Sequence, residues 1–251
     1  MSDTNIQKLI SAGIANAEQE LYWLEDYAAS QEQLAVWIEE RIQGKPLAYI
    51  IGHADFYGLN LIVNQNVLIP RFETESLIDL ILNHIPNDKT LNILDLGCGS
   101  GAIALALKKH RPKCNVYAID FSMPALSVAI QNQTKYPEHT VRWIQSNWLH
   151  GIDLNHIDLI VSNPPYVESN WQHNSISHEP NTALYSGKDG LDDIKKIIQQ
   201  TKDYKHLDIW FEHGHRHDLT KLIGSSWNIE KFNDLSGSPR FTHLSNKINH
   251  V

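Results

Sequence analysis

From residue 91 onward, short apolar segments alternate with segments of helical periodicity, and this alternation restricts the fold more than any other feature. The apolar segments 91–96 (LNILDL) and 115–120 (NVYAID) are each followed by a helical segment, at 101–110 and 124–133. Short runs that are apolar throughout are typical of parallel strands buried on both faces. The pattern predicts an α/β fold with a doubly wound, mostly parallel sheet, which binds ligands at the carboxyl ends of its strands. Further strands are expected at 141–145, 157–163, 207–213 and 240–244.

The first third of the chain has a different pattern. Apolar side chains recur at intervals of three and four through residues 4–43, and Asp26 and Ser30 indicate a break between short antiparallel helices. The β-forming residues on both sides of Tyr57-Gly58 predict a hairpin. Helical periodicity then returns from Glu73 to Ile85.

The charge distribution divides the chain at nearly the same place. Residues 1–90 contain 13 acidic and 5 basic side chains, so they carry the whole net charge of −8. We therefore expect a small N-terminal helical domain with a hairpin linker at 1–86 and an α/β domain at 87–251. An acidic segment beside a neutral one also argues against binding to a nucleic-acid backbone, which needs a basic face.

Cysteine content and hydropathy exclude several other classes. The two cysteines, Cys98 and Cys114, are too few for a disulfide scaffold or a four-cysteine zinc site, and they indicate a reducing compartment. No apolar run approaches the ~18 residues of a membrane span, and the N-terminus has no basic start leading into an apolar stretch. We expect a cytoplasmic monomer that binds neither nucleic acid nor membrane directly.

A glycine-rich loop joins the first strand of the α/β part to its helix. Gly97, Gly99 and Ala102 match the fingerprint of dinucleotide-binding folds, and Asp120 lies at about the ~20-residue distance expected of a ribose-binding acid. Such a loop serves adenosine in nicotinamide dinucleotides and in S-adenosylmethionine alike. It therefore indicates a nucleoside and leaves the chemistry open.

The segment Asn163-Pro164-Pro165-Tyr166 distinguishes between these two cofactors. It follows an apolar strand, and its prolines have no N–H with which to continue sheet pairing. The expected result is a stiff turn that offers an amide oxygen at Asn163, a backbone carbonyl at Pro164 and a flat ring at Tyr166. Two acceptors and a stacking surface suit a planar amino group.

On these motifs the chain resembles the class I S-adenosylmethionine-dependent methyltransferases, and more narrowly the branch that methylates glutamine in peptide-chain release factors. The NPPY string also occurs in DNA and RNA methylases, whereas LIPR followed by E-T just before the glycine loop is typical of the protein-glutamine branch. The resemblance covers most of the chain. It rests on PLAYIIG at 46–52, FYG at 56–58, VLIPRFETE at 67–75, DLGCGSGAIALAL at 95–107, SNW at 146–148, SNPPYV at 162–167, EPNTAL at 179–184 and EHG at 212–214.

The resemblance implies a Rossmann-like fold, S-adenosyl-L-methionine as cofactor and class I release factors as partners, methylated at the glutamine of a Gly-Gly-Gln motif to tune translation termination. The N-terminal helical unit would help to grip the release factor. Asp120 would hold the ribose, Trp148 would lie near the adenine, and Asn163 would contact both cofactor and target amide. The methionine part of the cofactor would be wrapped by Gly97, Cys98, Gly99, Ser100 and Gly101, and the glutamine would be bound by Asn163, Pro164, Pro165 and Tyr166.

The chemistry follows from the weakness of an amide as a nucleophile. The nitrogen lone pair is delocalised into the carbonyl, so the enzyme must aim the nitrogen and favour a pyramidal geometry. The Asn163 side-chain oxygen and the Pro164 carbonyl can draw both N–H bonds into place, and orientation of this kind can supply ~7–11 kcal/mol. The product can lose its proton after transfer, so no catalytic histidine is assigned.

The chain departs from the family pattern at two places near these motifs. Asn147 stands where family members usually have aspartate before the tryptophan, so an adenine amino group would be bound without charge assistance. Phe72 replaces the usual second proline of LIPRPET, and the C-terminal part from Trp227 onward is also less typical.

Alternative functions remain open on the sequence. A close variant would methylate a glutamine of a ribosomal protein. A DNA or RNA amino-methyltransferase is disfavoured by the acidic N-terminal unit, a nicotinamide oxidoreductase would leave NPPY unexplained, and a catalytically silent interaction protein would not need the intact motifs.

Several other residues have two readings. The alternating histidines His213, His215 and His217 suit a solvated loop better than a metal site, because no carboxylate or cysteine partner stands at ligand spacing. Glu212 either sits near the cofactor end of the sheet or has a structural role. Arg71 and Glu73 either line the substrate entrance or form an ion pair, and Cys98 is not expected to be a nucleophile.

Overall fold

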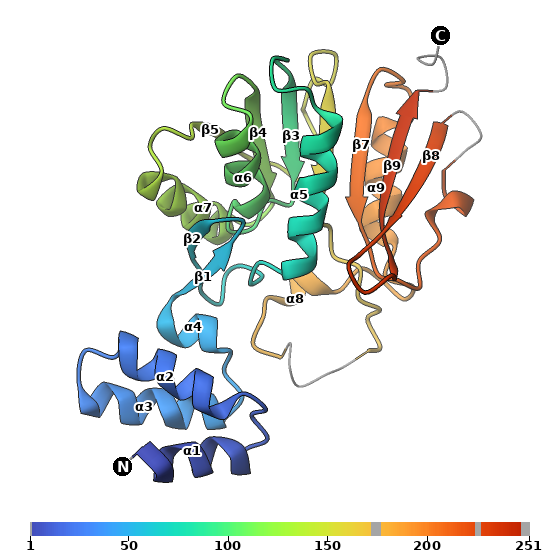
Figure 1. Ribbon diagram of the computed structural model, residues 1–251. Helices are drawn as coiled ribbons and strands as arrows, with labels where there is room; N and C mark the ends of the chain where they lie inside the picture. The colour runs from blue at the N-terminus through green and yellow to red at the C-terminus, as the bar shows by residue number, and fades with distance from the viewer. Residues whose placement is uncertain (1, 172–176, 224–226, 247–251) are drawn as a thin grey trace.

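The computed structural model describes residues 2–171, 177–223 and 227–246, and its larger part is a seven-stranded sheet (Figure 1). The strands are β3 (Asn92–Leu96), β4 (Asn115–Asp120), β5 (Val141–Gln145), β6 (Leu159–Ser162), β7 (Asp208–Glu212), β8 (Trp227–Asn233) and β9 (Pro239–Asn246). Their order in the sheet is β5-β4-β3-β6-β7-β9-β8. The first five in this order are parallel to one another, and β9 is antiparallel to both β7 and β8. The predicted doubly wound, mostly parallel sheet is confirmed.

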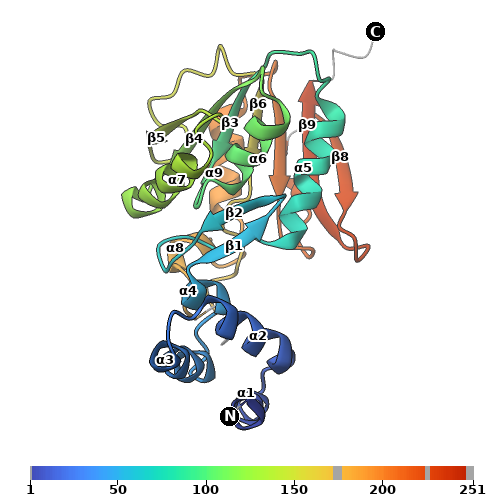
Figure 2. The same cartoon turned by 60° about the vertical axis from the view of Figure 1, so that its left-hand side comes forward.

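Helices cover both faces of the sheet (Figure 2). One face packs against α5 (Phe72–His84), α6 (Ala102–His110) and α7 (Met123–Lys135), and the other against α9 (Asp192–Thr201) and a short 3₁₀ turn, η2 (Leu219–Lys221). Successive residues of β3 point to alternate faces, so that Ile93 joins the first core and Leu94 the second. Burial on both sides explains why the strands are apolar throughout.

A small helical bundle precedes the sheet. It consists of α1 (Ser2–Ser11), α2 (Ala17–Tyr27), α3 (Gln31–Ile42) and α4 (Leu47–Ile51). These helices surround a separate core that includes Leu9, Leu21, Leu24 and Leu34. Ser30, the expected break, caps α3 by accepting a hydrogen bond from the backbone N–H of Gln33 at 3.2 Å. Both views show the bundle set apart from the sheet, below the carboxyl ends of its parallel strands (Figures 1 and 2).

The hairpin of β1 (His53–Phe56) and β2 (Leu59–Ile62) connects the bundle to the sheet. Its turn is at Tyr57-Gly58, where both residues have positive φ, 47° and 69°, as a two-residue hairpin turn requires. The side chain of Asn132 on α7 accepts from the N–H of Ile62 at 2.6 Å and donates to its carbonyl at 3.0 Å. These two hydrogen bonds attach the hairpin to α7, one of the helices that cover the sheet.

Helix α5 packs with the sheet although it precedes residue 87. Its buried residues Leu77, Ile78 and Ile81 belong to the same core as α6 and β3. By packing, α5 is part of the α/β layer. The division of the chain into domains at 1–86 and 87–251 stays a prediction.

Five elements were not foreseen in the sequence: α4, α8 (Asn181–Leu184), α9, η2 and β8. The helices α4 and α8 are too short to show a helical period. In α9, three of ten residues are buried, and charged and amide side chains occupy most of the remaining surface. Strand β8 is an edge strand with one fully buried residue, Trp227, so it lacks the apolar run of the central strands. No helix in the described ranges combines the length and the apolar character needed to cross a membrane.

Candidate functional site

The glycine loop lies between β3 and α6, at the carboxyl edge of the sheet. Gly97, Gly99 and Gly101 all have left-handed φ, of 73°, 54° and 82°. The N–H groups of Gly97 and Cys98 donate to the carbonyl of Ile119 at 2.8 and 2.9 Å, which ties the loop to the end of β4. A Cβ at Gly101 would lie 2.7 Å from the Trp143 ring, whereas a Cβ at Gly99 would meet nothing within 4 Å. The absence of a side chain at Gly101 therefore allows the Trp143 ring to pack against the loop, whereas Gly99 faces open space.

Asp120 ends β4 and holds the loop from the other side. Its Oδ2 accepts from the N–H of Gly99 at 2.9 Å, and its Oδ1 accepts from the N–H of Ser122 at 2.8 Å. Burial raises the pKa of Asp120, although these backbone hydrogen bonds lower it. A carboxylate accepts about four hydrogen bonds, so lone pairs remain for the hydroxyls of a ribose.

A second acid, Asp95, lies beneath the loop at the end of β3. It is fully buried, and its Oδ2 accepts from the N–H of Ala104 in the first turn of α6 at 3.1 Å. Burial raises the pKa of Asp95 to about 8, against the effect of that hydrogen bond. Asp95 therefore supports the loop from inside the core, out of reach of a ligand.

The Asn-Pro-Pro-Tyr segment begins directly after β6, and a chain of side chains orients its first residue. Asn163 Nδ2 donates to Thr74 Oγ1 at 3.1 Å, and Thr74 Oγ1 donates to Glu212 Oε2 at 2.7 Å. While Glu212 is ionised, it accepts the single hydrogen of the Thr74 hydroxyl, so Thr74 accepts from Asn163. This assigns the orientation of the Asn163 amide and leaves its Oδ1 available as an acceptor with respect to the residues that the structure describes.

Glu212 and Thr74 are both buried, at the end of β7 and in the first turns of α5. Burial raises the pKa of Glu212 to about 7, although the hydrogen bond from Thr74 lowers it. Of the two readings of Glu212, the structure thus places it near the carboxyl edge, in contact with the residue that holds Asn163. Thr74 was not singled out in the sequence, although it belongs to the ETE string that follows LIPR.

The glycine loop, Asp120 and the start of the Asn-Pro-Pro-Tyr segment meet at one cavity of about 330 Å³. The volume lies in the usual range of ligand pockets. Segments that are far apart in the sequence supply its walls: the glycine loop, the ends of β4 and β6, residues 66–68, residues 146–148 and residues 180–185. Of the predicted site residues, Gly97, Gly99, Asp120, Trp148, Asn163 and Pro165 line this cavity.

The remaining predicted site residues lie outside the cavity lining: Cys98, Ser100, Gly101, Pro164 and Tyr166. Cys98 and Ser100 are buried within the loop, and Pro164 is buried in the corner. Tyr166 is half-buried with its ring beside Gly214. Burial and the charge of Glu212 raise the pKa of Tyr166 to about 12, so it remains a neutral phenol at physiological pH.

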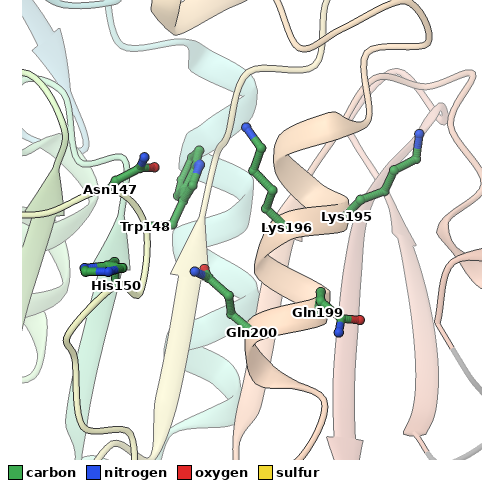
Figure 3. Close-up of a pocket in the computed structure, with 7 residues that line it drawn as sticks. All are labelled: Asn147, Trp148, His150, Lys195, Lys196, Gln199 and Gln200. Atoms are coloured by element: carbon green, nitrogen blue, oxygen red, sulfur yellow. The ribbon is translucent and has the colours of Figure 1, made fainter.

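Helix α9 contributes to one side of the cavity, and it faces the loop that carries Asn147 and Trp148 across an adjoining open hollow (Figure 3). Trp148 has a left-handed φ of 52°, and its Nε1 donates to Asp193 Oδ1 at 3.1 Å. Lys196 contacts the same oxygen at 2.9 Å, and both Asp193 and Lys196 line the cavity. Beyond this pair an open hollow continues past His150 and Lys195. Asp193 and Lys196 were missed in the sequence because nothing there indicates that α9 faces Trp148.

The LIPR segment is held by Glu179 of the EPN segment. Arg71 forms an ion pair with the buried carboxylate of Glu179, whose Oε1 also accepts from the N–H of Ile69 at 3.1 Å. The alternative ion pair between Arg71 and Glu73 is not formed. The pair with Glu179 instead joins two segments that flank the cavity.

The histidines of the HGHRH string do not converge on a metal site among the residues that the structure describes. His213 is buried, with its Nε2 at 2.9 Å from Thr242 Oγ1 and its Nδ1 at 3.1 Å from the Gly214 carbonyl. His215 is exposed. The expected solvated loop describes His215, whereas the buried His213 departs from that expectation.

Comparison with known proteins adds independent findings. Residues 74–181 match a family model described as the methyltransferase small domain. The chain is 36% identical over 219 residues to a release factor glutamine methyltransferase of Coxiella burnetii, covering 87% of this chain and 79% of the relative. It is 40% identical over 220 residues to the protein of the same name from Buchnera aphidicola, and the match covers 84% of this chain and 79% of that relative.

Among solved structures, a human METTL16 catalytic domain crystallised with an RNA hairpin superposes with a TM-score of 0.60. The match covers 87% of this chain and 82% of that domain, at 14% sequence identity. At this identity the similarity concerns the fold alone.

Proposed function

Because the chain belongs to the release factor glutamine methyltransferases, we propose that it methylates the glutamine side-chain amide nitrogen in the Gly-Gly-Gln motif of class I peptide-chain release factors. The position of the Asn163 side chain is the structural observation that supports this proposal. The free amide oxygen of Asn163 stands at the same cavity as the glycine loop and Asp120. An acceptor for an amide N–H thus lies beside a nucleoside-binding edge.

The cofactor is S-adenosyl-L-methionine, whose sulfonium supplies an electrophilic methyl group. The residues around the cavity fit this molecule. Asp120 retains lone pairs for the ribose hydroxyls, Gly99 leaves open space where a side chain would stand, and Trp148 offers an aromatic surface beside the cavity. Asn147 also lines the cavity and can accept a hydrogen bond through its amide oxygen.

The task of the protein is to orient a poor nucleophile. In this proposal Asn163 Oδ1 and the Pro164 carbonyl accept the two amide N–H bonds, and the rigid proline pair keeps both acceptors at a constant spacing. Thr74 and Glu212 hold the amide of Asn163 in the orientation that exposes its oxygen. Tyr166 supplies a neutral ring next to this corner, against which the carboxamide can stack.

The ionisation of Glu212 is part of this arrangement. While the Glu212 carboxylate is charged, it accepts a hydrogen bond from the Thr74 hydroxyl. Thr74 in turn accepts a hydrogen bond from Asn163 Nδ2, which leaves Asn163 Oδ1 available to the target amide. When Glu212 is protonated, it can donate to Thr74, which can then donate to the oxygen of Asn163 and occupy that acceptor. The active form is therefore the ionised one.

The N-terminal bundle is proposed to bind the release factor. Three aromatic side chains of α2 are exposed, Tyr22, Trp23 and Tyr27, with 61%, 41% and 46% of their surface accessible. Aromatic residues of this kind are enriched at protein interfaces. The bundle lies on the side of the molecule where the sheet presents its carboxyl ends (Figure 1), so a release factor bound there can extend a loop to the cavity.

The nucleic-acid alternative is less consistent with the charge pattern. The excess negative charge is in residues 1–90, which include the bundle and the hairpin next to the site. A phosphate backbone approaching this side would be repelled. We therefore propose a cytoplasmic, monomeric protein-modifying enzyme.

The test uses purified protein, labelled S-adenosylmethionine and three acceptors: a class I release factor, the same factor with its Gly-Gly-Gln glutamine replaced by alanine, and duplex DNA. Label is expected in the intact release factor only. Equal label in the alanine-substituted factor, or label in DNA alone, would refute the assignment.

A further inference from the structure

A second cluster of polar residues lies at the end of β7 that is remote from the cavity. It contains His84, the last residue of α5, Asp208, the first residue of β7, and His243 of β9. One nitrogen or oxygen atom from each lies within 4.8 Å of the others. The end of α5 and the start of β7 stand at the edge of the sheet away from the hairpin and the bundle (Figure 1).

The distances in this cluster resemble those between ligands of one metal ion. His84 Nε2 is 3.2 Å from Asp208 Oδ2, and His243 Nε2 is 3.2 Å from Asp208 Oδ1. Hydrogen bonds between charged nitrogen and oxygen are typically about 2.7–2.9 Å long. Two ligands bound tetrahedrally to zinc at about 2.0–2.2 Å stand roughly 3.3–3.6 Å apart. The two contacts of 3.2 Å are made to different oxygens of Asp208, and one ligand atom from each residue lies within 4.8 Å of the others, so the side chains must close slightly around an ion.

The hydrogen-bond partners of His243 also indicate a cation. Its Nδ1 is 3.0 Å from Glu230 Oε2 on β8, while its Nε2 faces Asp208. A neutral imidazole has one N–H and cannot donate to both carboxylates. With Nδ1–H donated to Glu230, either a proton or a metal ion must lie between Nε2 and the Asp208 carboxylate, and zinc binding distinguishes the two. A carboxylate on the outer nitrogen is also the usual partner of a metal-bound histidine.

The charges balance for a divalent ion. Asp208 and Glu230 each contribute one negative charge, and two neutral imidazoles contribute none. The two oxygens of Asp208 each lie 3.2 Å from an imidazole nitrogen, so one carboxylate faces both histidines. Imidazole and carboxylate together are a ligand set that suits Zn²⁺.

The cluster is rigid on one side and open on the other. His243 is 2% exposed, and its ring stacks on Trp210 with centroids 4.1 Å apart. The side chains of His84 and Asp208 are 39% and 36% exposed, so an ion can enter and a water can complete the coordination. We propose that His84, Asp208 and His243 form a zinc site that fastens the end of α5 to β7 and to the antiparallel edge of the sheet.

The test measures Zn²⁺ binding to the full chain. The protein is treated with a chelator, dialysed against ZnCl₂, passed through a desalting column and assayed for metal content, and its melting temperature is recorded with and without Zn²⁺. The expected result is one retained Zn²⁺ per chain and a higher melting temperature with the ion.

Three variants assign the site, and one controls for surface binding. His84→Ala and Asp208→Asn are expected to lose the retained ion and the thermal shift, while Glu230→Gln is expected to weaken binding by roughly 10–100-fold. His215→Ala removes an exposed histidine outside the cluster and is expected to bind like the wild type. Failure of the wild type to retain zinc, retention by both His84→Ala and Asp208→Asn, or loss in His215→Ala would each overturn the proposal.

Discussion

Two carboxyl groups at the same edge of the sheet, the half-buried Asp120 and the buried Glu212, have different roles. Asp120, at the end of β4, accepts hydrogen bonds from the backbone N–H groups of Gly99 and Ser122. Glu212, at the end of β7, accepts from the side chain of Thr74, which in turn accepts from Asn163. Asp120 thus holds the backbone of the glycine loop, whereas Glu212 orients the side chain of Asn163 through Thr74.

The difference shows how the site divides its tasks. The cofactor loop is shaped by backbone geometry, so it depends on glycines and tolerates changes in neighbouring side chains. The Asn-Pro-Pro-Tyr corner is shaped by a chain of side chains, so single substitutions can change its chemistry while the fold remains. The following predictions test this division.

The largest effect is expected for Asn163→Ala. Loss of the acceptor that aims the target amide should lower kcat by roughly 10²–10³-fold, as removal of one preorganised polar group does in other enzymes. The melting temperature should change little, because Asn163 is only partly buried. A methylation assay with release factor and a thermal melt measure both quantities, and turnover at the wild-type rate would contradict the proposed mechanism.

Glu212→Gln should change the dependence of stability on pH. The folded pKa of Glu212 is about 7, above its ordinary value of 4.5, so the folded state binds more protons between these two values. The free energy of unfolding should therefore fall as pH rises through this window, by about 3 kcal/mol for this group alone. Because Asp95 behaves similarly in both proteins, the difference between wild type and Glu212→Gln in urea titrations at pH 5 and pH 8 isolates Glu212. Parallel curves would contradict the prediction.

Gly101→Ala and Gly99→Ala form a matched pair in the cofactor loop. Both substitutions add a Cβ at a positive φ, but only the Cβ at Gly101 would overlap Trp143, at 2.7 Å. Gly101→Ala should therefore lower the free energy of unfolding by about 1–3 kcal/mol more than Gly99→Ala, as overpacking usually does. Gly99→Ala should mainly weaken cofactor binding, because the added methyl points into open space at the cavity. Denaturant titration and calorimetry separate the two outcomes, and equal stabilities would show that Gly101 has no packing role.

The smallest effect is expected for Thr74→Val, which keeps the shape of the side chain and removes its hydroxyl. Loss of the bond that holds the amide of Asn163 should lower kcat by about tenfold, the equivalent of roughly 1–1.5 kcal/mol, with little change in cofactor affinity. Thr74→Ser, which retains the hydroxyl, should restore turnover. Equal rates in the valine and serine variants would exclude a positioning role for Thr74.

Much of the fold and part of the site could be predicted from sequence because their signals are local. Apolar runs locate β3, β4 and β6, and the glycines and prolines mark two corners that must break regular structure. Strands that alternate with helices must lie parallel, so the ends of β3, β4 and β6 were expected at one edge. Gly97, Gly99, Asp120, Trp148, Asn163 and Pro165 accordingly line a single cavity.

The rest depended on which distant segments become neighbours. Thr74 and Glu212 are 138 residues apart, Arg71 and Glu179 are 108 apart, and Trp148 and Asp193 are 45 apart. Each pair consists of common residue types, and no spacing rule connects them along the chain.

The sequence by itself thus determined the alternating architecture and the two backbone corners, since both follow from steric limits and apolar periodicity within a few residues. Only the tertiary structure decided which side chain holds Asn163 and which faces Trp148. Those contacts depend on strand order and helix placement, which are fixed when the whole core packs.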